Sequence, residues 1–220
     1  MRPVLAYHVV LTAYGFWLPN DPRGSWSAFV RSFALYRAGG PATKVGTRRS
    51  VAHASHDRAA RARAKAALVR PPVMFSGVQA RAIAGGLREY CVANRRPVHA
   101  LAILPDHVHL IVGRCELDIE TVATLLKGRA TTCLSKAGLH PFAAEPCRGG
   151  RLPTPWARKA WSVFLDDRAE VRRAIQYVEA NPVKAGYARQ SYAWLTPFLR
   201  GGLAGAEGRA KVAHLGAADF

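Results

Sequence analysis

The run LPDHVHLIV at residues 104–112 constrains the fold of this chain more than any other stretch. His107 and His109 lie two residues apart in it, and apolar residues alternate with them. In a β-strand, residues i and i+2 point to the same face, so both imidazoles would leave one face while the apolar side chains fill the other. Two neutral imidazoles on one strand are two thirds of a facial metal site. A third ligand must come from another part of the fold.

The charge of the chain indicates a polyanionic partner. Its 220 residues, half of them hydrophobic, are enough to bury a core as one domain, and its formal net charge is +18. Nucleic acid is therefore the expected partner. A membrane is less favoured, because the positive charge is not confined to one helix or tail and no apolar run is long enough to span a bilayer. The four cysteines show no Cys-x-x-Cys spacing, and the N-terminus lacks a signal-peptide pattern, so we expect a cytoplasmic protein with free thiols.

Periodicity and capping residues predict both strands and helices. Ser76 and Gln79 form a capping-box pattern, and Asp118 is a good N-cap. Pro182 predicts that the last helix ends at Asn181 or close to it. The expected strands cover residues 4–12, 97–104, 106–112 and 160–165, and the expected helices cover residues 55–70, 76–94, 118–136 and 168–181.

Residues 37–70 differ from the rest of the chain and are interpreted as an insertion. A Gly-rich basic stretch is followed by a helix-forming segment that has no acidic residue between Arg58 and Arg70. Its basic side chains share one helical face. This face is either simply solvated or an arm that contacts phosphates.

Two N-terminal features also leave alternatives open. The loop at residues 13–27 interleaves Arg23 with aromatic residues, a mixture that either stacks on bases and holds phosphates or pins the loop to the core. His8 lies on the first expected strand. It could approach the metal from a neighbouring strand, but a single histidine in a strand is more often a packing residue.

The helix expected at residues 168–181 carries Tyr177 and Asn181 one turn apart on the flank of its apolar stripe. From there Tyr177 could reach a groove beside the sheet, and Asn181 offers a carbonyl oxygen, which is a hard ligand acceptable to Mg²⁺ or Mn²⁺. The alternative is that Tyr177 is an aromatic residue at the edge of the core and that Asn181 only ends the helix.

Four segments together resemble the single-tyrosine HUH transposases, specifically the REP-associated tyrosine transposases and their insertion-sequence relatives (transposase IS200-like). They are AYHVVLTAYG, ALAILPDHVHLIVG, LKGR and YVEANPVKAGY. The resemblance covers most of the chain except residues 37–70 and the C-terminal tail. It implies an α+β, ferredoxin-like domain at residues 1–200, with an antiparallel sheet flanked by helices. Residues 201–220, rich in Gly and Ala, are expected to be a poorly ordered tail.

The resemblance also implies a chemistry. Tyr177 would be the nucleophile, and His107, His109 and Asn181 would hold a divalent ion, Mg²⁺ or Mn²⁺. Attack on DNA would give a covalent 5′-phosphotyrosine and a free 3′-OH that can attack in reverse. The substrate would be single-stranded DNA with a hairpin nearby, cut by a monomer or homodimer at the bacterial nucleoid. The basic residues expected to contact this DNA are Arg23, Lys127, Arg129, Arg173 and Lys184.

Two other classes of function stay open at this point. A nucleic-acid-binding relative would keep the fold without cleaving DNA. A metal-dependent hydrolase would use the two histidines to activate water and would release free phosphate ends. A covalent protein–DNA adduct distinguishes the transposase from both alternatives.

Overall fold

The computed structural model describes residues 3–23, 30, 32–43, 54–145 and 149–198. No helix in this described part is long and apolar enough to cross a membrane. The predicted tail at residues 201–220 lies outside it, as do residues 44–53 of the predicted insertion. In chain order the elements are β1 (Ala6–Ala13), α1 (Phe33–Gly39), α2 (Arg58–Ala66), α3 (Gly77–Ala93), β2 (Val98–Ile103), β3 (His107–Gly113), α4 (Ile119–Lys136), β4 (Trp156–Leu165) and α5 (Arg168–Lys184).

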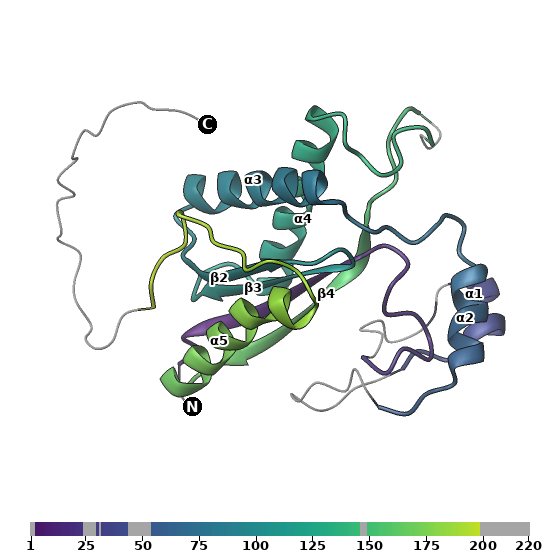
Figure 1. Ribbon diagram of the computed structural model, residues 1–220, viewed down its shortest axis with the longest axis horizontal. Helices are drawn as coiled ribbons and strands as arrows, with labels where there is room; N and C mark the ends of the chain where they lie inside the picture. The colour runs from purple at the N-terminus through teal and green to yellow at the C-terminus, as the bar shows by residue number, and fades with distance from the viewer. Residues whose placement is uncertain (1–2, 24–29, 31, 44–53, 146–148, 199–220) are drawn as a thin grey trace.

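The four strands form one antiparallel sheet with the order β2-β3-β1-β4. Along the chain, β1, α3, β2, β3, α4 and β4 follow one another as strand, helix, two strands, helix and strand. This succession and this strand order are those of a ferredoxin-like α+β fold, so the predicted fold class is confirmed. Helices α3 and α4 lie on one side of the sheet and α5 on the other, while α1 and α2 form a separate pair at one end (Figure 1).

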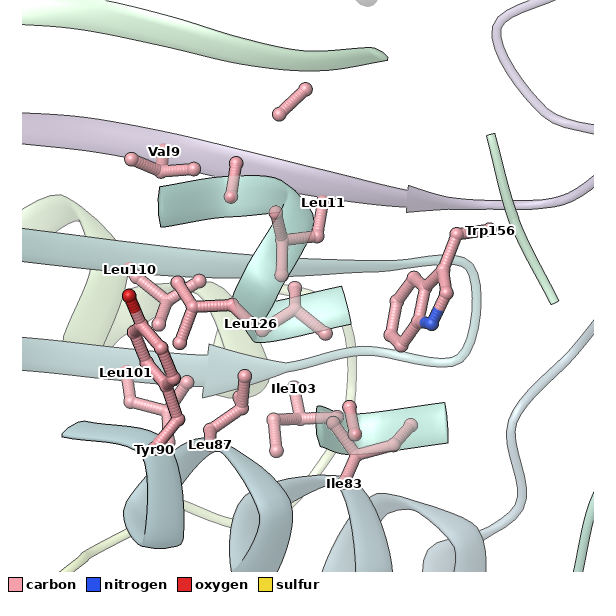
Figure 2. Packing of buried hydrophobic residues seen from close by; sticks show 14 of the residues in the cluster. Val9, Leu11, Ile83, Leu87, Tyr90, Leu101, Ile103, Leu110, Leu126 and Trp156 are labelled. Carbon is pink, nitrogen blue, oxygen red and sulfur yellow. The ribbon is translucent and has the colours of Figure 1, made fainter. Parts of the chain in front are cut away.

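The larger core lies between the sheet and the pair α3 and α4. Side chains of alternate strand residues, among them Val9, Leu11 and Leu110, meet Leu87 of α3 and Leu126 of α4 (Figure 2). All five are fully buried. The three apolar residues that alternate with the histidines of β3 belong to this cluster, as the two-residue period of the strand predicts.

The other face of the sheet is covered by α5, and β2 contributes small side chains to it. Ala100 and Ala102 of β2 are fully buried there beside Ile111 of β3, and they pack against Val171 and Val178 of α5. Alanine side chains keep this face shallow, so α5 can lie close to the strand that carries the histidines. The alanines of β2 therefore help to determine on which face of the sheet α5 packs.

The predicted N-caps of α3 and α4 are confirmed. Both halves of the capping box of α3 form, since the backbone N–H of Ser76 donates to Gln79 Oε1 at 2.8 Å and the Ser76 hydroxyl oxygen accepts from Gln79 N–H. The Asp118 carboxylate accepts from two N–H groups in the first turn of α4.

The expected boundaries of three elements were wrong. α2 begins at Arg58, because Asp57 rather than Ser55 supplies the cap, and it ends at Ala66 rather than at residue 70. β4 begins at Trp156, four residues earlier than predicted. α5 continues through Pro182 to Lys184. Pro182 lies in the last turn, where its missing N–H removes only one bond of the helix, and its carbonyl still accepts from N–H groups further along the chain. No element was predicted where α1 lies.

The chain that follows α5 runs along the outer edge of β2. The side-chain amide of Gln190 pairs with Ile103 as a neighbouring strand would: it donates to the carbonyl of Ile103 at 2.7 Å and accepts from its N–H at 2.8 Å. Further along, the N–H of Thr196 donates to the carbonyl of Val98. These bonds satisfy backbone groups that an edge strand otherwise leaves open.

Helices α3 and α4 approach each other at Gly86, which yields a prediction on stability. A Cβ at this position would lie 2.8 Å from the Cα of Ala130 and 2.8 Å from the carbonyl oxygen of Arg129. Since both atoms are backbone, the helices would have to separate. We expect Gly86→Ala to lower the free energy of unfolding by about 1–3 kcal/mol, measured by urea denaturation.

Gly85 provides the matched control. Within the described part of the chain, no atom other than those of the adjoining helix backbone lies within 4 Å of a Cβ built at this position. We therefore expect Gly85→Ala to be neutral or to stabilise the protein by up to about 1 kcal/mol, because alanine is the better helix former. Equal stability of Gly86→Ala and Gly85→Ala would contradict the close packing of the two helices.

Candidate functional site

The two histidines of β3 converge on the face of the sheet that α5 covers. His107 Nε2 and His109 Nε2 lie 3.0 Å apart. His109 is 6% exposed, and the His107 side chain is 16% exposed. The structure therefore brings both predicted ligands together, with the same nitrogen of each ring directed toward the other.

The second nitrogen of His109 contacts a histidine on the next strand. His8 lies on β1 opposite Ile111, so it is the diagonal cross-strand neighbour of His109. Its Nε2 lies 2.9 Å from His109 Nδ1, and its ring packs edge-on against Trp161 of β4. Burial, and then the charge of nearby His107, lower the pKa of His8 to about 4. Burial also lowers the pKa of His109 well below its usual value, helped by His107 and His8.

The second nitrogen of His107 contacts a carboxylate. His107 Nδ1 lies 2.6 Å from Asp106 Oδ1. An ionised carboxylate only accepts, so the hydrogen of this bond belongs to the imidazole. Burial alone would raise the pKa of Asp106, but the hydrogen bond from His107 and the charges of His107 and Arg23 outweigh it and lower that pKa to about 2. With both Nδ1 atoms engaged, the Nε2 atoms are the ones left to bind a ligand.

A chain of ion pairs connects this site to α2, which lies in the predicted insertion. Arg23 donates to Asp106 at 3.3 Å and to Asp21 at 2.9 Å. Asp21 is 2% exposed and also pairs with Arg61 of α2 at 3.5 Å. Burial would raise the pKa of Asp21, but its bonds to Arg23 and the charge of Arg61 lower it instead. The structure thus places Arg23, a predicted DNA contact, between two carboxylates beside His107.

Tyr177 of α5 lies over the buried histidines. The centroid of its ring is 5.7 Å from that of His109 and 5.9 Å from that of His8, both in edge-to-face orientation. The residue is 38% exposed, so its ring reaches from the histidines to solvent. Lys184 Nζ lies 5.6 Å from the centre of the same ring. Tyr177 and Lys184 are far from the histidines in sequence, and the fold places both of them beside His109 or its neighbours.

Two buried polar groups near the site lack partners. Asn181 lies one turn after Tyr177, and among the described residues its side-chain nitrogen has no hydrogen-bond partner. The same is true of the hydroxyl of Thr12, which is opposite His107 in the sheet register. An unsatisfied buried polar group costs about 1–3 kcal/mol. A half-turn of the Asn181 amide would exchange its nitrogen for the carbonyl oxygen.

These features fit a divalent cation. Two ligands at neighbouring corners of an octahedron lie about 3.0 Å apart when each is about 2.1 Å from the ion, which is the spacing of the two Nε2 atoms. Across the described residues, no group of three His, Cys, Asp or Glu side chains is arranged to hold a metal. A third protein ligand would be of another kind, and the Asn181 oxygen is a hard donor of the type that Mg²⁺ and Mn²⁺ accept.

Arg173, the fourth of the predicted DNA contacts, lies near Tyr177. It is exposed on α5 one turn before the tyrosine, so Arg173, Tyr177 and Asn181 follow one another at four-residue spacing along one flank of the helix. This flank presents a cation on either side of the tyrosine, since Lys184 follows it.

The remaining two predicted contacts lie on α4, on the opposite side of the sheet. Lys127 is 8% exposed, and its Nζ donates to the carbonyls of Ala157 and Arg158 at 3.0 Å each. Burial lowers the pKa of Lys127. Its buried ammonium group therefore joins α4 to β4 and is not available on the surface. Arg129 is exposed on α4, away from Tyr177.

Sequence reasoning placed neither Asp106 nor Asp21 in the site. Asp106 carries a local signal, because it directly precedes the H-x-H pair, and a carboxylate next to a ligand histidine is a common orienting partner. Asp21 carries none, since it is far from His107 in sequence and meets the site only through Arg23. The sequence allows His8 to be either a packing residue or a direct ligand, and the structure places its ring against the nitrogen of His109 that faces away from His107.

Comparison with known proteins identifies no family for this chain. No family model and no curated protein matches it. Among solved structures, a REP-associated tyrosine transposase bound to a REP hairpin superposes with a TM-score of 0.43 and 12% identity, over 86% of this chain and 73% of that one. A protein of Deinococcus radiodurans that bears the name of a transposase superposes with a TM-score of 0.36 and 16% identity, over 86% and 95%. Neither likeness assigns a role to a residue of this chain.

The buried histidines make the metal-free protein sensitive to acid. The unfolded chain protonates histidine near its usual pKa of 6.5, whereas folded His8 does so only near 4. Between these values the unfolded state binds more protons, so stability falls as the pH is lowered. We expect the free energy of unfolding to decrease by about 1 kcal/mol per pH unit through His8 in this window, measured by urea denaturation with a chelator present. The lowered pKa of His109 acts in the same direction.

A variant separates this effect from general acid denaturation. His8→Gln removes one of the two buried histidines, so its stability should depend less steeply on pH over the same window. Asp106 has a pKa of about 2, so its protonation affects stability only at a pH below this window. A wild-type stability that does not change from about pH 7 to about pH 5 would show that these histidines are not held neutral.

Proposed function

We propose that this protein is a metal-dependent, single-stranded DNA transposase that cuts and rejoins DNA through a covalent 5′-phosphotyrosine on Tyr177. The observation that carries the proposal is the position of a half-exposed tyrosine ring 5.7 Å from the ring of His109, beside two histidine Nε2 atoms that face each other. A nucleophile and a cation site next to each other are the two parts that such phosphoryl transfer requires.

The charge of the chain supports DNA as the substrate. The protein carries a formal net charge of +18, and Arg173 and Lys184 flank the tyrosine on α5. Cations on this flank can bind the phosphates on either side of the bond to be cut. The resemblance of the H-x-H and Y-x-x-x-N-P segments to REP-associated tyrosine transposases makes single-stranded DNA with a hairpin the substrate of choice for a first test.

The reaction exchanges one phosphodiester for another. Tyr177 Oη bonds to phosphorus, the bond from phosphorus to the 3′ oxygen breaks, the phenol loses its proton and the leaving 3′ oxygen gains one. The 5′ phosphate is then held on the tyrosine, and attack by a 3′-OH reverses the step. Strands can therefore be rejoined without ATP.

The residues around Tyr177 have separate tasks in this scheme. His107, His109 and the Asn181 oxygen would hold a divalent ion, which when bound supplies charge neutralisation and orientation at a non-bridging phosphate oxygen. Asp106 fixes the orientation of the His107 ring. The rigid helix α5 holds the tyrosine at the site, so that its oxygen can approach phosphorus in line with the leaving group.

The nucleophile is tested with a hairpin DNA from the flanks of the gene, labelled at its 3′ end and incubated with Mn²⁺. The labelled strand should become attached to the protein and survive a denaturing gel. Tyr177→Phe removes only the hydroxyl, so it should bind this DNA as the wild type does and lower adduct formation by at least about 10³-fold.

Tyr187 offers a control on the same segment of the chain. It is 50% exposed just after α5, so Tyr187→Phe should leave the adduct unchanged. Labelled DNA with free phosphate ends and no adduct would instead indicate a metal-dependent hydrolase. Tight binding without either product would indicate a protein that only binds DNA. Each of these two results would overturn the proposal.

The cation is tested by chelation and by substitution of a predicted ligand. EDTA should abolish adduct formation, and excess Mg²⁺ or Mn²⁺ should restore it. His107→Ala removes one of the two facing nitrogens and should reduce adduct formation by at least about 10²-fold at limiting metal concentration. His99→Ala, which alters a β2 histidine bonded to the carbonyl of Thr196, should behave as the wild type. Unaltered metal dependence in His107→Ala would remove this residue from the site.

A further inference from the structure

His8 occupies a position from which it can set the hydrogen-bonding state of His109. Its side chain is buried between strand β4 and helix α5, with ring centroids 5.1 Å from Trp161 and 5.9 Å from Tyr177. The residue is 7% exposed, and its Nε2 lies 2.9 Å from His109 Nδ1. Aromatic neighbours on two sides restrict rotation of the His8 ring, so this contact has a defined geometry.

The direction of this hydrogen bond decides which nitrogen of His109 has a free lone pair. A neutral imidazole carries its hydrogen on one nitrogen and accepts on the other. If His8 donates, the hydrogen of His109 is on Nε2, and that atom cannot bind a cation. If His8 accepts, the hydrogen is on Nδ1, and the lone pair of His109 Nε2 is directed toward His107 Nε2, 3.0 Å away.

The other histidine of the pair is already held in the equivalent state. His107 Nδ1 faces the Asp106 carboxylate at 2.6 Å, so it carries a hydrogen. Its Nε2 is then the atom available to a ligand. A cation shared by the two Nε2 atoms requires the same state of His109, and the only partner of His109 Nδ1 within the described residues is His8.

We infer that His8 is a positioning residue: its Nε2 accepts the hydrogen of His109 Nδ1 and thereby holds the His109 Nε2 lone pair toward His107. The two ligand histidines are thus oriented by different partners, His107 by the Asp106 carboxylate and His109 by a second imidazole. This role of His8 rests on the proposed function, because it concerns the cation of the same site.

The test measures binding of Mn²⁺ alone, without DNA, by the electron paramagnetic resonance signal of the free ion. His8→Leu introduces an apolar side chain that offers no acceptor, and loss of a partner of this type costs about 10- to 100-fold in metal affinity. His8→Gln places a carbonyl oxygen at a similar reach and should remain within about threefold of wild type. His99→Leu is the control for removal of a histidine outside the site.

A second readout observes the hydrogen itself and needs no variant that might misfold. In ¹⁵N-labelled wild-type protein loaded with Mg²⁺, long-range proton–nitrogen spectra distinguish the two ring nitrogens of each histidine. We expect the hydrogen of His109 on Nδ1. A hydrogen on Nε2 of His109, with His8 as the donor, would overturn the inference. So would Mn²⁺ affinity in His8→Leu equal to wild type, or absence of Mn²⁺ binding by the wild type.

These outcomes are separate from failure of the proposed function. Mn²⁺ binding that weakens in His8→Leu and recovers in His8→Gln, without any adduct at Tyr177, would support the role of His8 and reject the transposase. An adduct that depends on Tyr177, with His8→Leu binding Mn²⁺ as tightly as the wild type, would support the transposase and reject the role of His8.

Discussion

The two-residue period of β3 couples the core of this protein to its candidate site. Leu110 and its apolar neighbours face α3 and α4, and this forces His107 and His109 onto the face under α5. A slip of the strand by one residue would turn both imidazoles into the main core and the apolar residues toward α5. The free energy that stabilises the core therefore also fixes the site. Alanines of β2 on the same face let α5, and with it Tyr177, approach the histidines.

Basic and acidic side chains alternate in a row that leads to the two histidines. Arg61, Asp21, Arg23 and Asp106 form a line of opposite charges that ends on His107, and the pKa values of both carboxylates are lowered even though burial alone would raise them. On the other side His109 contacts the rings of His8, which its low pKa keeps neutral, and of Tyr177. The two histidines therefore lie between an ionic network and a group of aromatic rings.

Sequence periodicity was sufficient for the parts of this structure that depend on local rules. The strand bearing His107, the capping box at Ser76 and the helix bearing Tyr177 all follow from spacing that a single element determines. Contacts between elements could not be found in this way. The inward direction of Lys127 depends on where β4 crosses α4, and the contact of Asp21 with Arg61 depends on how α2 packs. The sequence predicts a helix end at Pro182, whereas in the structure this proline only removes one hydrogen bond from the last turn.

The pairing of Gln190 with Ile103 makes the chain after α5 part of the domain. A side-chain amide there takes the place of an additional strand and closes the outer edge of β2, and Thr196 continues the same seam. The segment after α5 is therefore an integral border of the sheet rather than a trailing linker. A version of the protein cut immediately behind the tyrosine helix would uncover the backbone of β2, and an uncovered strand of this kind invites pairing with other chains.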